Sequence, residues 1–190
     1  MKHSQTTYRI LIADDEEQAR SAVRAQIEAI GHEVIGEATN GEEALALAQK
    51  LLPDCVVMDI RMPKMDGITA AKTISDAVHC PVLLLTAFTN DELSLQAAES
   101  GAYYYLTKPA KISDLRSAIQ VCVARFKELQ QVRRRLESKT LVQRAKGILM
   151  DEFGLKEQEA HAKIHFTARN RNLTMEEVAK AIIEKKKMPE

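Results

Sequence analysis

The sequence predicts an α/β domain built on a doubly wound, five-stranded parallel sheet, followed by a long helix and a small all-α domain of three helices. Short, almost uninterrupted apolar runs alternate with helical periodicity over residues 1–122, a pattern typical of parallel strands covered on both faces. Beyond residue 122 only helical periodicity remains. The balance of charge also changes sign there. Together these observations predict two domains of different class.

Each expected strand is an apolar run that stops at polar residues. The five runs lie at residues 9–13, 33–37, 55–58, 81–85 and 103–107. Helical patterns fill the connections at residues 18–30, 42–51, 68–78 and 93–100. Gly31 and Gly101 are the expected ends of the first and fourth of these helices. A further helix is expected to begin near Ser113.

Composition narrows the class of protein. The chain has 190 residues, of which 45% are hydrophobic and 28% are charged, with 27 basic and 27 acidic side chains. This excludes a wholly disordered chain and a uniformly basic nucleic-acid binder. No apolar stretch approaches the roughly 20 residues that cross a bilayer, and residues 1–7 lack the apolar run of a signal peptide. Three widely spaced cysteines indicate free thiols in a reducing compartment, so we expect a cytoplasmic protein: Cys55, Cys80 and Cys122.

The zero net charge conceals two halves of opposite sign. Residues 1–122 contain 11 Lys and Arg against 17 Asp and Glu, a net charge of −6. Residues 123–190 contain 16 Lys and Arg against 10 Asp and Glu, a net charge of +6. A basic second half indicates a polyanionic partner, although solvation of helix surfaces explains the charge equally well.

Polar residues with complementary chemistry follow four of the expected strands. Asp14 and Asp15 follow the first, and Asp59, Thr86 and Lys108 stand at the ends of the third, fourth and fifth. Parallel strands bring these ends to one edge of the sheet, where α/β proteins bind ligands. Oxygen ligands without His or Cys favour Mg²⁺ over zinc. The cluster therefore predicts a site where a carboxylate beside Mg²⁺ attacks phosphorus and the Lys and Thr contact phosphoryl oxygens.

Residues 8–122 resemble the receiver domain of two-component response regulators, which has a flavodoxin-like fold. The resemblance rests on ILIADDE at residues 10–16, VMDIRMP at 57–63 with Asp66-Gly67, LTA at 85–87 and YLTKP at 105–109. It implies that a sensor histidine kinase phosphorylates Asp59. It also implies no enzyme activity beyond the receiver's own phosphoryl transfer and dephosphorylation at that residue.

The same resemblance implies one Mg²⁺ ion per receiver domain. Asp14, Asp15 and Asp59 would hold this ion, together with the backbone carbonyl of Arg61.

It further implies a switch at the last two strands. Lys108 would pair with the phosphoryl group, and Thr86 and Tyr105 would turn toward it in step. The peptide bond before Pro109 is usually cis in this family.

The helix that leaves the receiver-like region carries a heptad pattern. Apolar residues recur at alternating steps of four and three, with one interruption at Arg133: Leu115, Ile119, Cys122, Phe126, Leu129 and Leu136. Ile119 and Cys122 are expected to pack on the sheet, and Phe126, Leu129 and Leu136 lie beyond the expected end of the receiver. Their partner is either a second copy of the chain, in a two-stranded coiled coil, or the C-terminal domain of the same chain.

Residues 138–190 predict three helices. An apolar stripe over residues 141–149 marks the first, which Gly154 ends, and residues 157–170 form the second. A capping box from Thr174 to Glu177 opens the third. Its expected buried face consists of Val178, Ala181 and Ile182.

This segment resembles the ANTAR domain, an RNA-binding module of transcription antiterminators. The resemblance rests on RAKGILM at residues 144–150, then Glu159-Ala160, Ala168, Asn170 and Val178-Ala179. Basic residues on the predicted helices would form an electrostatic footprint for phosphates. The candidate RNA contacts are Arg144, Lys146, Gly147, Lys163, His165, Arg169 and Arg171.

The chain departs from that family at two histidines. An aromatic residue often follows the position of Ala160 and a basic residue that of Ile164, where this chain has His161 and His165. No third metal ligand lies near the pair, which favours two histidines on a polar face over a metal site. Phe166 is the one aromatic beside the basic residues, and burial in the core explains it as well as RNA contact does.

These patterns predict a receiver domain at residues 1–122, a helical coiled-coil linker at 123–137 and an ANTAR domain at 138–190. The predicted function is a phosphorylation-activated regulator that binds tandem RNA hairpins as a homodimer and prevents transcription termination. A DNA-binding output is one alternative, but residues 174–190 contain no Asn, Gln or Arg for a recognition helix. An output through protein contacts alone is the other.

Overall fold

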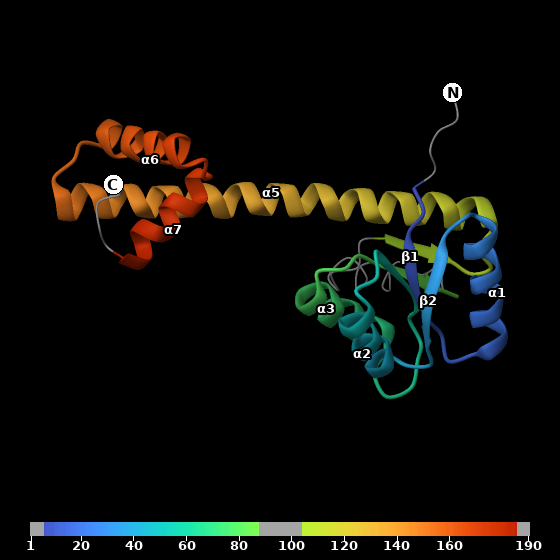
Figure 1. Ribbon diagram of the computed structural model, residues 1–190. Coiled ribbons are helices and arrows are strands. Elements are labelled where there is room, and N and C mark those ends of the chain that lie inside the picture. Colours follow the sequence, from blue (N-terminus) through green and yellow to red (C-terminus); the bar gives the residue numbers. More distant parts are fainter. Residues whose placement is uncertain (1–5, 88–103, 186–190) are drawn as a thin grey trace, which may run out of the picture. The chain divides into compact units, whose positions relative to one another are not determined.

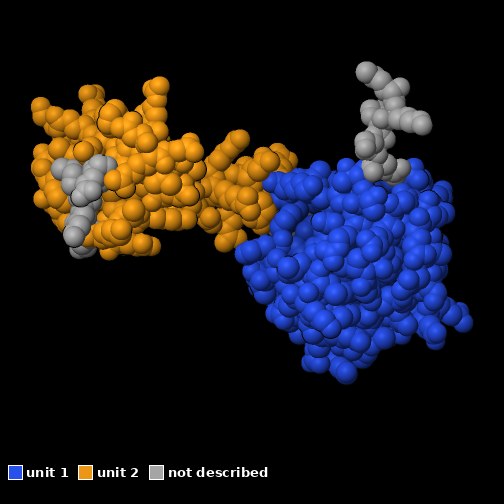
Figure 2. All heavy atoms as spheres, in the orientation of Figure 1, with its two compact units in different colours: residues 1–127 blue, residues 128–190 orange. Residues whose placement is uncertain are grey.

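A computed structural model describes residues 6–87 and 104–185 of the chain. The chain divides into two compact units, residues 1–127 and residues 128–190 (Figure 2). The helix expected at residues 93–100, its end at Gly101 and the first residue of the fifth expected strand, Tyr103, lie outside the described residues. Among the described residues, no helix is both long and apolar enough to cross a membrane.

The first unit contains a five-stranded sheet in the order β2-β1-β3-β4-β5, and every neighbouring pair is parallel (Figure 1). The strands are β1 (Arg9–Ala13), β2 (Glu33–Ala38), β3 (Cys55–Asp59), β4 (Val82–Thr86) and β5 (Tyr104–Thr107). The helices are α1 (Glu17–Ala29), α2 (Gly41–Leu51), α3 (Gly67–Val78) and the beginning of α5 (Ile112–Phe153). The predicted α/β fold is thereby confirmed.

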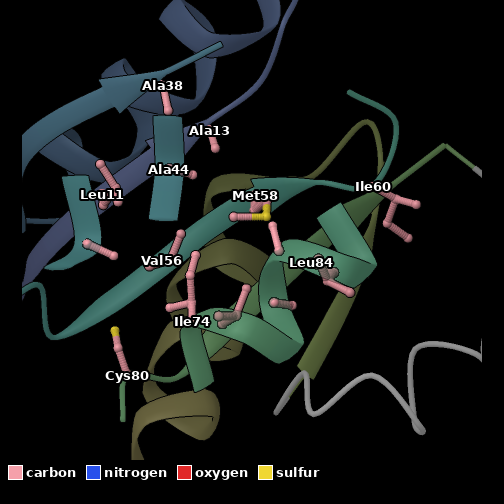
Figure 3. Close-up of a cluster of buried hydrophobic side chains, with 14 residues drawn as sticks. Leu11, Ala13, Ala38, Ala44, Val56, Met58, Ile60, Ile74, Cys80 and Leu84 are labelled. Atoms are coloured by element: carbon pink, nitrogen blue, oxygen red, sulfur yellow. The ribbon is translucent and has the colours of Figure 1, made fainter. Parts of the chain in front are cut away.

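Helices cover both faces of the sheet, because successive strand residues point to opposite sides. On one face, the side chains of Leu11, Val56 and Leu84 pack with those of α2 and α3 (Figure 3). On the other face, strand residues pack with α1 and the start of α5, where Ile119 and Cys122 are fully buried, as expected, and Leu115 is buried beside them. The three central strands, β1, β3 and β4, are therefore apolar on both sides and hold their carboxyl ends in fixed positions.

Local signals set the start of two helices next to the strand ends. The Asn40 side chain caps α2 by accepting the backbone N–H of Glu43, at 3.0 Å. The Asp66 side chain caps α3 by accepting the backbone N–H of Thr69, at 2.9 Å. Because a side-chain oxygen satisfies an N–H group that the helix leaves unpaired, each cap fixes the loop before it. The α3 cap closes the loop that follows Asp59.

The second unit consists of the C-terminal part of α5, then α6 (Glu157–Arg171) and α7 (Met175–Lys185). One continuous helix from Ile112 to Phe153 includes both the predicted linker and the first helix of the C-terminal domain. Gly154, at φ +67°, follows its last residue, as predicted. The apolar core joins the three helices and contains Ala145, Leu149, Ala160, Ile164, Ala168, Val178, Ala179 and Ile182.

The third helix differs from its prediction at one position. The capping box is present, since the Glu177 N–H donates to Thr174 Oγ1 at 3.2 Å and the Thr174 N–H donates to Glu177 Oε2 at 2.7 Å. Ala181, however, is exposed, and Ala179 is buried in its place. Ala179 faces the core because Met175 and Ile183 also pack there, so the buried side of α7 extends from Val178 and Ile182 toward Ala179 and away from Ala181.

Candidate functional site

Two acidic residues and one lysine meet at the carboxyl ends of β1, β3 and β5. The ammonium of Lys108 lies 2.8 Å from Asp14 Oδ2 and 2.5 Å from Asp59 Oδ1. Asp14 and Asp59 are buried, with only 2% and 9% of their surfaces exposed. The predicted convergence of these strand ends is present in the structure, and one cation pairs with two buried carboxylates, which leaves the triad with an excess of negative charge.

The backbone holds both carboxylates in place. The second oxygen of Asp59 accepts the Arg61 N–H at 2.8 Å, and the second oxygen of Asp14 accepts the Glu16 N–H at 3.0 Å. Each carboxylate therefore uses one oxygen for the loop that follows it and the other for Lys108. The Lys108–Pro109 peptide bond is cis, as the family resemblance implies.

The carboxylates determine the charge state of Lys108. Burial alone lowers the pKa of its ammonium, but the hydrogen bonds and charge attraction from Asp14 and Asp59 outweigh burial and hold the pKa above its ordinary value. The lysine is consequently charged at every physiological pH and is placed to attract a further anionic oxygen.

Asp15 and Arg61 stand apart from this triad. Asp15 is exposed, and both residues line an open recess of about 650 Å³ that also includes Met62, Pro63 and Asp66. No three Asp, Glu, His or Cys side chains gather in a metal-holding group within residues 6–87 and 104–185. The chemistry of the donors nevertheless suits Mg²⁺, since two buried carboxylates outnumber the one ammonium and Mg²⁺ keeps several of its water ligands.

The predicted switch residues occupy different environments. Thr86 ends β4 and is buried, and its carbonyl accepts the Lys108 N–H at 2.7 Å. Tyr105 lies in β5 with 47% of its surface exposed, and its ring stacks against Tyr104 at a centroid distance of 6.4 Å. The Tyr105 ring therefore stands outside the core.

Removing the charge of Lys108 tests the electrostatics of the triad. We expect Lys108→Met to lower the free energy of unfolding of the first unit by about 2 kcal/mol, because two buried carboxylates lose their cation. Added Mg²⁺ should restore more stability to this variant than it adds to the wild type. Urea unfolding followed by tyrosine fluorescence measures this, since all four tyrosines lie before residue 128. Lys111→Met, at an exposed position, is the control, and equal unfolding curves for the two variants would contradict the prediction.

The predicted RNA contacts of the second unit fall into two groups. Arg144, His165, Arg169 and Arg171 are exposed, and Lys163 is partly exposed. Lys146 differs, because it is only 9% exposed and its ammonium lies 2.7 Å from Glu157 Oε1. This contact holds the pKa of the Glu157 carboxyl below its ordinary value and ties α5 to the start of α6. Burial favours a structural contribution from Lys146 and leaves the exposed cations as the accessible charges.

Sequence reasoning missed one residue of the acidic site. Arg20, in α1, donates to the backbone carbonyl of Asp14 at 2.8 Å and to Glu37 Oε2 at 2.9 Å. Glu37 also pairs with Arg24, and both arginines lower the pKa of its carboxyl. Arg20 thus fixes the loop that carries Asp14 and Asp15. Every residue has a backbone carbonyl, so the residue types alone do not indicate which carbonyl an arginine contacts. No sequence signal therefore identified this contact.

Comparisons with known proteins agree with both units. Residues 10–120 match the response regulator receiver domain family, and residues 130–183 match the ANTAR domain family. The transcriptional regulatory protein PdtaR of Mycobacterium tuberculosis is 40% identical over 183 residues, covering 93% of this chain and 89% of PdtaR.

Two solved structures resemble the first unit. The signal receiver domain of the putative response regulator NarL from Mycobacterium tuberculosis has 32% identity and a TM-score of 0.59, over 63% of this chain and 98% of that one. A chain of the CheX-CheY-BeF₃-Mg²⁺ complex from Borrelia burgdorferi has 27% identity and a TM-score of 0.56, over 59% of this chain and 86% of that one.

Proposed function

Because this chain belongs to the two-component response regulators, with a receiver domain followed by an ANTAR domain, we propose that phosphorylation of Asp59 activates RNA binding and thereby prevents transcription termination. It is a regulator and not a member of an enzyme family. The observation that carries the proposal is the buried Asp59, held 2.5 Å from Lys108, in the same chain as a basic ANTAR domain. The proposed place of action is the cytoplasm, where kinase and nascent RNA meet.

The phosphorylation step needs only groups that the site contains and a phosphohistidine on a sensor kinase. A carboxylate oxygen of Asp59 attacks phosphorus, the phosphorus–nitrogen bond breaks, and an acyl phosphate forms on Asp59 while the histidine regains its proton from solvent. Lys108 then pairs with a phosphoryl oxygen, and the hydroxyl of Thr86 donates to another. Tyr105 turns inward as Thr86 moves.

Asp14, Asp15 and Asp59 would hold the Mg²⁺ ion, together with the backbone carbonyl of Arg61. When bound, the ion supplies positive charge that neutralises the phosphoryl oxygens. The recess beside Asp15 and Arg61 leaves room for its water ligands.

We propose a dimer through α5 as the form that binds RNA. Leu129, Val132 and Leu136 are exposed and recur at steps of three and four, which makes an apolar stripe of the coiled-coil type. Phe126, one turn earlier, is partly buried. A dimer places two ANTAR domains on two tandem hairpins, and linked sites gain avidity without new contacts. Two RNA loops held in this way block a competing terminator.

Binding measurements test the function directly. The full chain is titrated, with Mg²⁺ and with or without beryllofluoride, against tandem-hairpin RNAs with randomised loops and against duplex DNA of equal length. Light scattering on the same samples gives the oligomeric state. We expect tighter RNA binding and a dimer with beryllofluoride. Preference for the duplex DNA, or binding to neither nucleic acid, would contradict the RNA output.

Gly147 allows a second test at the RNA surface. It lies inside α5, and a Cβ atom added there meets nothing within 4 Å. Glycine costs a helix interior about 0.5–1 kcal/mol relative to alanine, and no contact within the domain requires its small size. We therefore infer that the RNA backbone approaches this position.

Gly147→Ala should accordingly stabilise the ANTAR domain by about 0.5–1 kcal/mol while it weakens RNA binding about tenfold, through a clash of about 1.4 kcal/mol. Thermal melting by circular dichroism and RNA titration measure the two effects. Thr140→Ala, which raises helix propensity without adding bulk, is the control and should keep wild-type affinity. A Gly147→Ala protein that binds RNA as the wild type does would refute the close approach.

A further inference from the structure

Phe166 is an aromatic residue that the domain does not bury. Its side chain projects from α6 and is 62% exposed, whereas Ile164 and Ala168 on the same helix belong to the core. The ring therefore does not contribute to the core of the domain. Exposure of its apolar surface to water costs free energy. Of the two explanations that the sequence allowed, burial in the core is wrong.

Two cations lie on either side of the ring along the helix. Lys163 precedes Phe166 by three residues and Arg169 follows it by three, so the three side chains are neighbours on one strip of the surface. Neither cation forms an ion pair with any residue that the structure describes. An apolar ring between two positive charges is complementary to a single strand of nucleic acid, in which flat bases alternate with negatively charged phosphates.

A recess of about 870 Å³ opens beside the ring. Leu155, Ala162 and Phe166 give it an apolar lining, and His161, Lys163 and His165 stand around them. Glu159 also borders the recess, but its carboxylate accepts the Lys156 N–H at 2.8 Å and so serves the start of α6. The recess therefore offers an apolar surface surrounded by hydrogen-bond donors.

We propose that Phe166 stacks on one unpaired base of the RNA loop, which the recess receives while Lys163 and Arg169 hold the phosphates on either side of it. The inference rests on the proposed function and names a specific contact of that function. Stacking on an aromatic side chain is how proteins hold bases that have left a helix, and hairpin loops supply such bases. The flanking charges favour this occupant over an apolar partner helix, which would need a longer apolar stripe.

Substitution of the ring separates stacking from simple apolar contact. With the tightest RNA from the randomised-loop pool and beryllofluoride present, Phe166→Ala and Phe166→Leu should each weaken binding about tenfold to a hundredfold. Phe166→Trp should keep wild-type affinity, because an indole also stacks. Phe153→Ala, an exposed phenylalanine outside the recess, is the matched control and should bind as the wild type does. All four variants should melt like the wild type in the absence of RNA, apart from small shifts.

A fluorescent base then identifies the stacked position. We expect 2-aminopurine at one loop position to be quenched by the wild type and not by Phe166→Ala. Equal RNA affinity for wild type and Phe166→Ala would overturn the stacking inference but not the proposed function. Equal losses of RNA affinity in Phe166→Leu and Phe166→Trp would have the same consequence. A Phe166→Ala chain that loses self-association without RNA would assign the ring to an interface between copies. A wild type that binds no RNA would overturn the proposed function and the inference together.

Discussion

An Asp59→Asn protein is expected to accept no phosphoryl group and to bind RNA with an affinity that no longer responds to beryllofluoride. The substitution keeps the size of the side chain and the acceptor for the Arg61 N–H, and removes the nucleophilic carboxylate. In the wild type, a coupling of about 1–3 kcal/mol between the two sites would raise RNA affinity about 5- to 150-fold on activation. The variant should lose that entire factor, because the mimic binds the same carboxylate.

Two measurements check this expectation. Intact-protein mass spectrometry after incubation with a small phosphodonor and Mg²⁺ detects phosphoryl uptake, and RNA titration with and without beryllofluoride detects the coupling. Asp76→Asn, on the exposed side of α3, is the control and should behave as the wild type in both. Uptake of a phosphoryl group by Asp59→Asn would show that another carboxylate is the phosphoryl acceptor, and Asp15 would be the next residue to substitute.

The fold and the acidic site were predictable from sequence for related reasons. Strands buried on both faces must be apolar throughout, so β1, β3 and β4 are plain in the sequence. Parallel strands then bring their ends together whatever lies between them, which is why Asp14, Asp59 and Lys108 could be placed side by side although 94 residues separate the first from the last. The residue types at the strand ends were therefore enough to predict the composition of the site, without a prediction of any individual contact.

Contacts between helices were less predictable. Helical periodicity identifies the apolar face of a helix, but it does not identify the element against which that face packs. Lys146 follows the RNA-contact pattern in sequence, yet Glu157 reaches it from beyond the turn at Gly154 and ties it into the domain. Phe166 and Ile164 are only two residues apart and both apolar, and a rotation of about 200° along the helix sends one to the surface and the other to the core. The exposed ring became visible as a candidate contact only once the packing of α6 was known.

Each unit has a glycine at a position where the absence of a side chain leaves space for other atoms, Gly147 in the second unit and Gly67 in the first. At Gly147 the space is open, and we assign it to RNA. At Gly67 the space is filled by the phosphorylation site itself: a Cβ atom added there would lie 2.0 Å from the Asp59 carbonyl oxygen and 3.0 Å from Ile60 Cα. The Gly67 N–H donates to the Ile60 carbonyl at 2.8 Å, so the loop after Asp59 closes tightly against the start of α3.

Gly67→Ala should therefore destabilise the receiver domain by about 3 kcal/mol or more, because the clash is with backbone atoms that cannot rotate away. It should also slow phosphoryl uptake, since any relief of the clash displaces the backbone of Asp59. Urea unfolding followed by tyrosine fluorescence reports the receiver domain, and mass spectrometry reports the uptake. Gly147→Ala is the matched control, in which the same added methyl group should leave both receiver measurements unchanged.

The two readouts distinguish loss of fold from loss of geometry. At a urea concentration where Gly67→Ala is still fully folded, uptake should remain slower than in the wild type, because the carboxylate of Asp59 no longer meets Lys108 at 2.5 Å. A variant that unfolds early yet is phosphorylated at the wild-type rate when folded would show that the loop packs against Gly67 for stability alone. Wild-type stability and uptake together would mean that the loop after Asp59 moves freely enough to accept a side chain, contrary to the hydrogen bond that closes it.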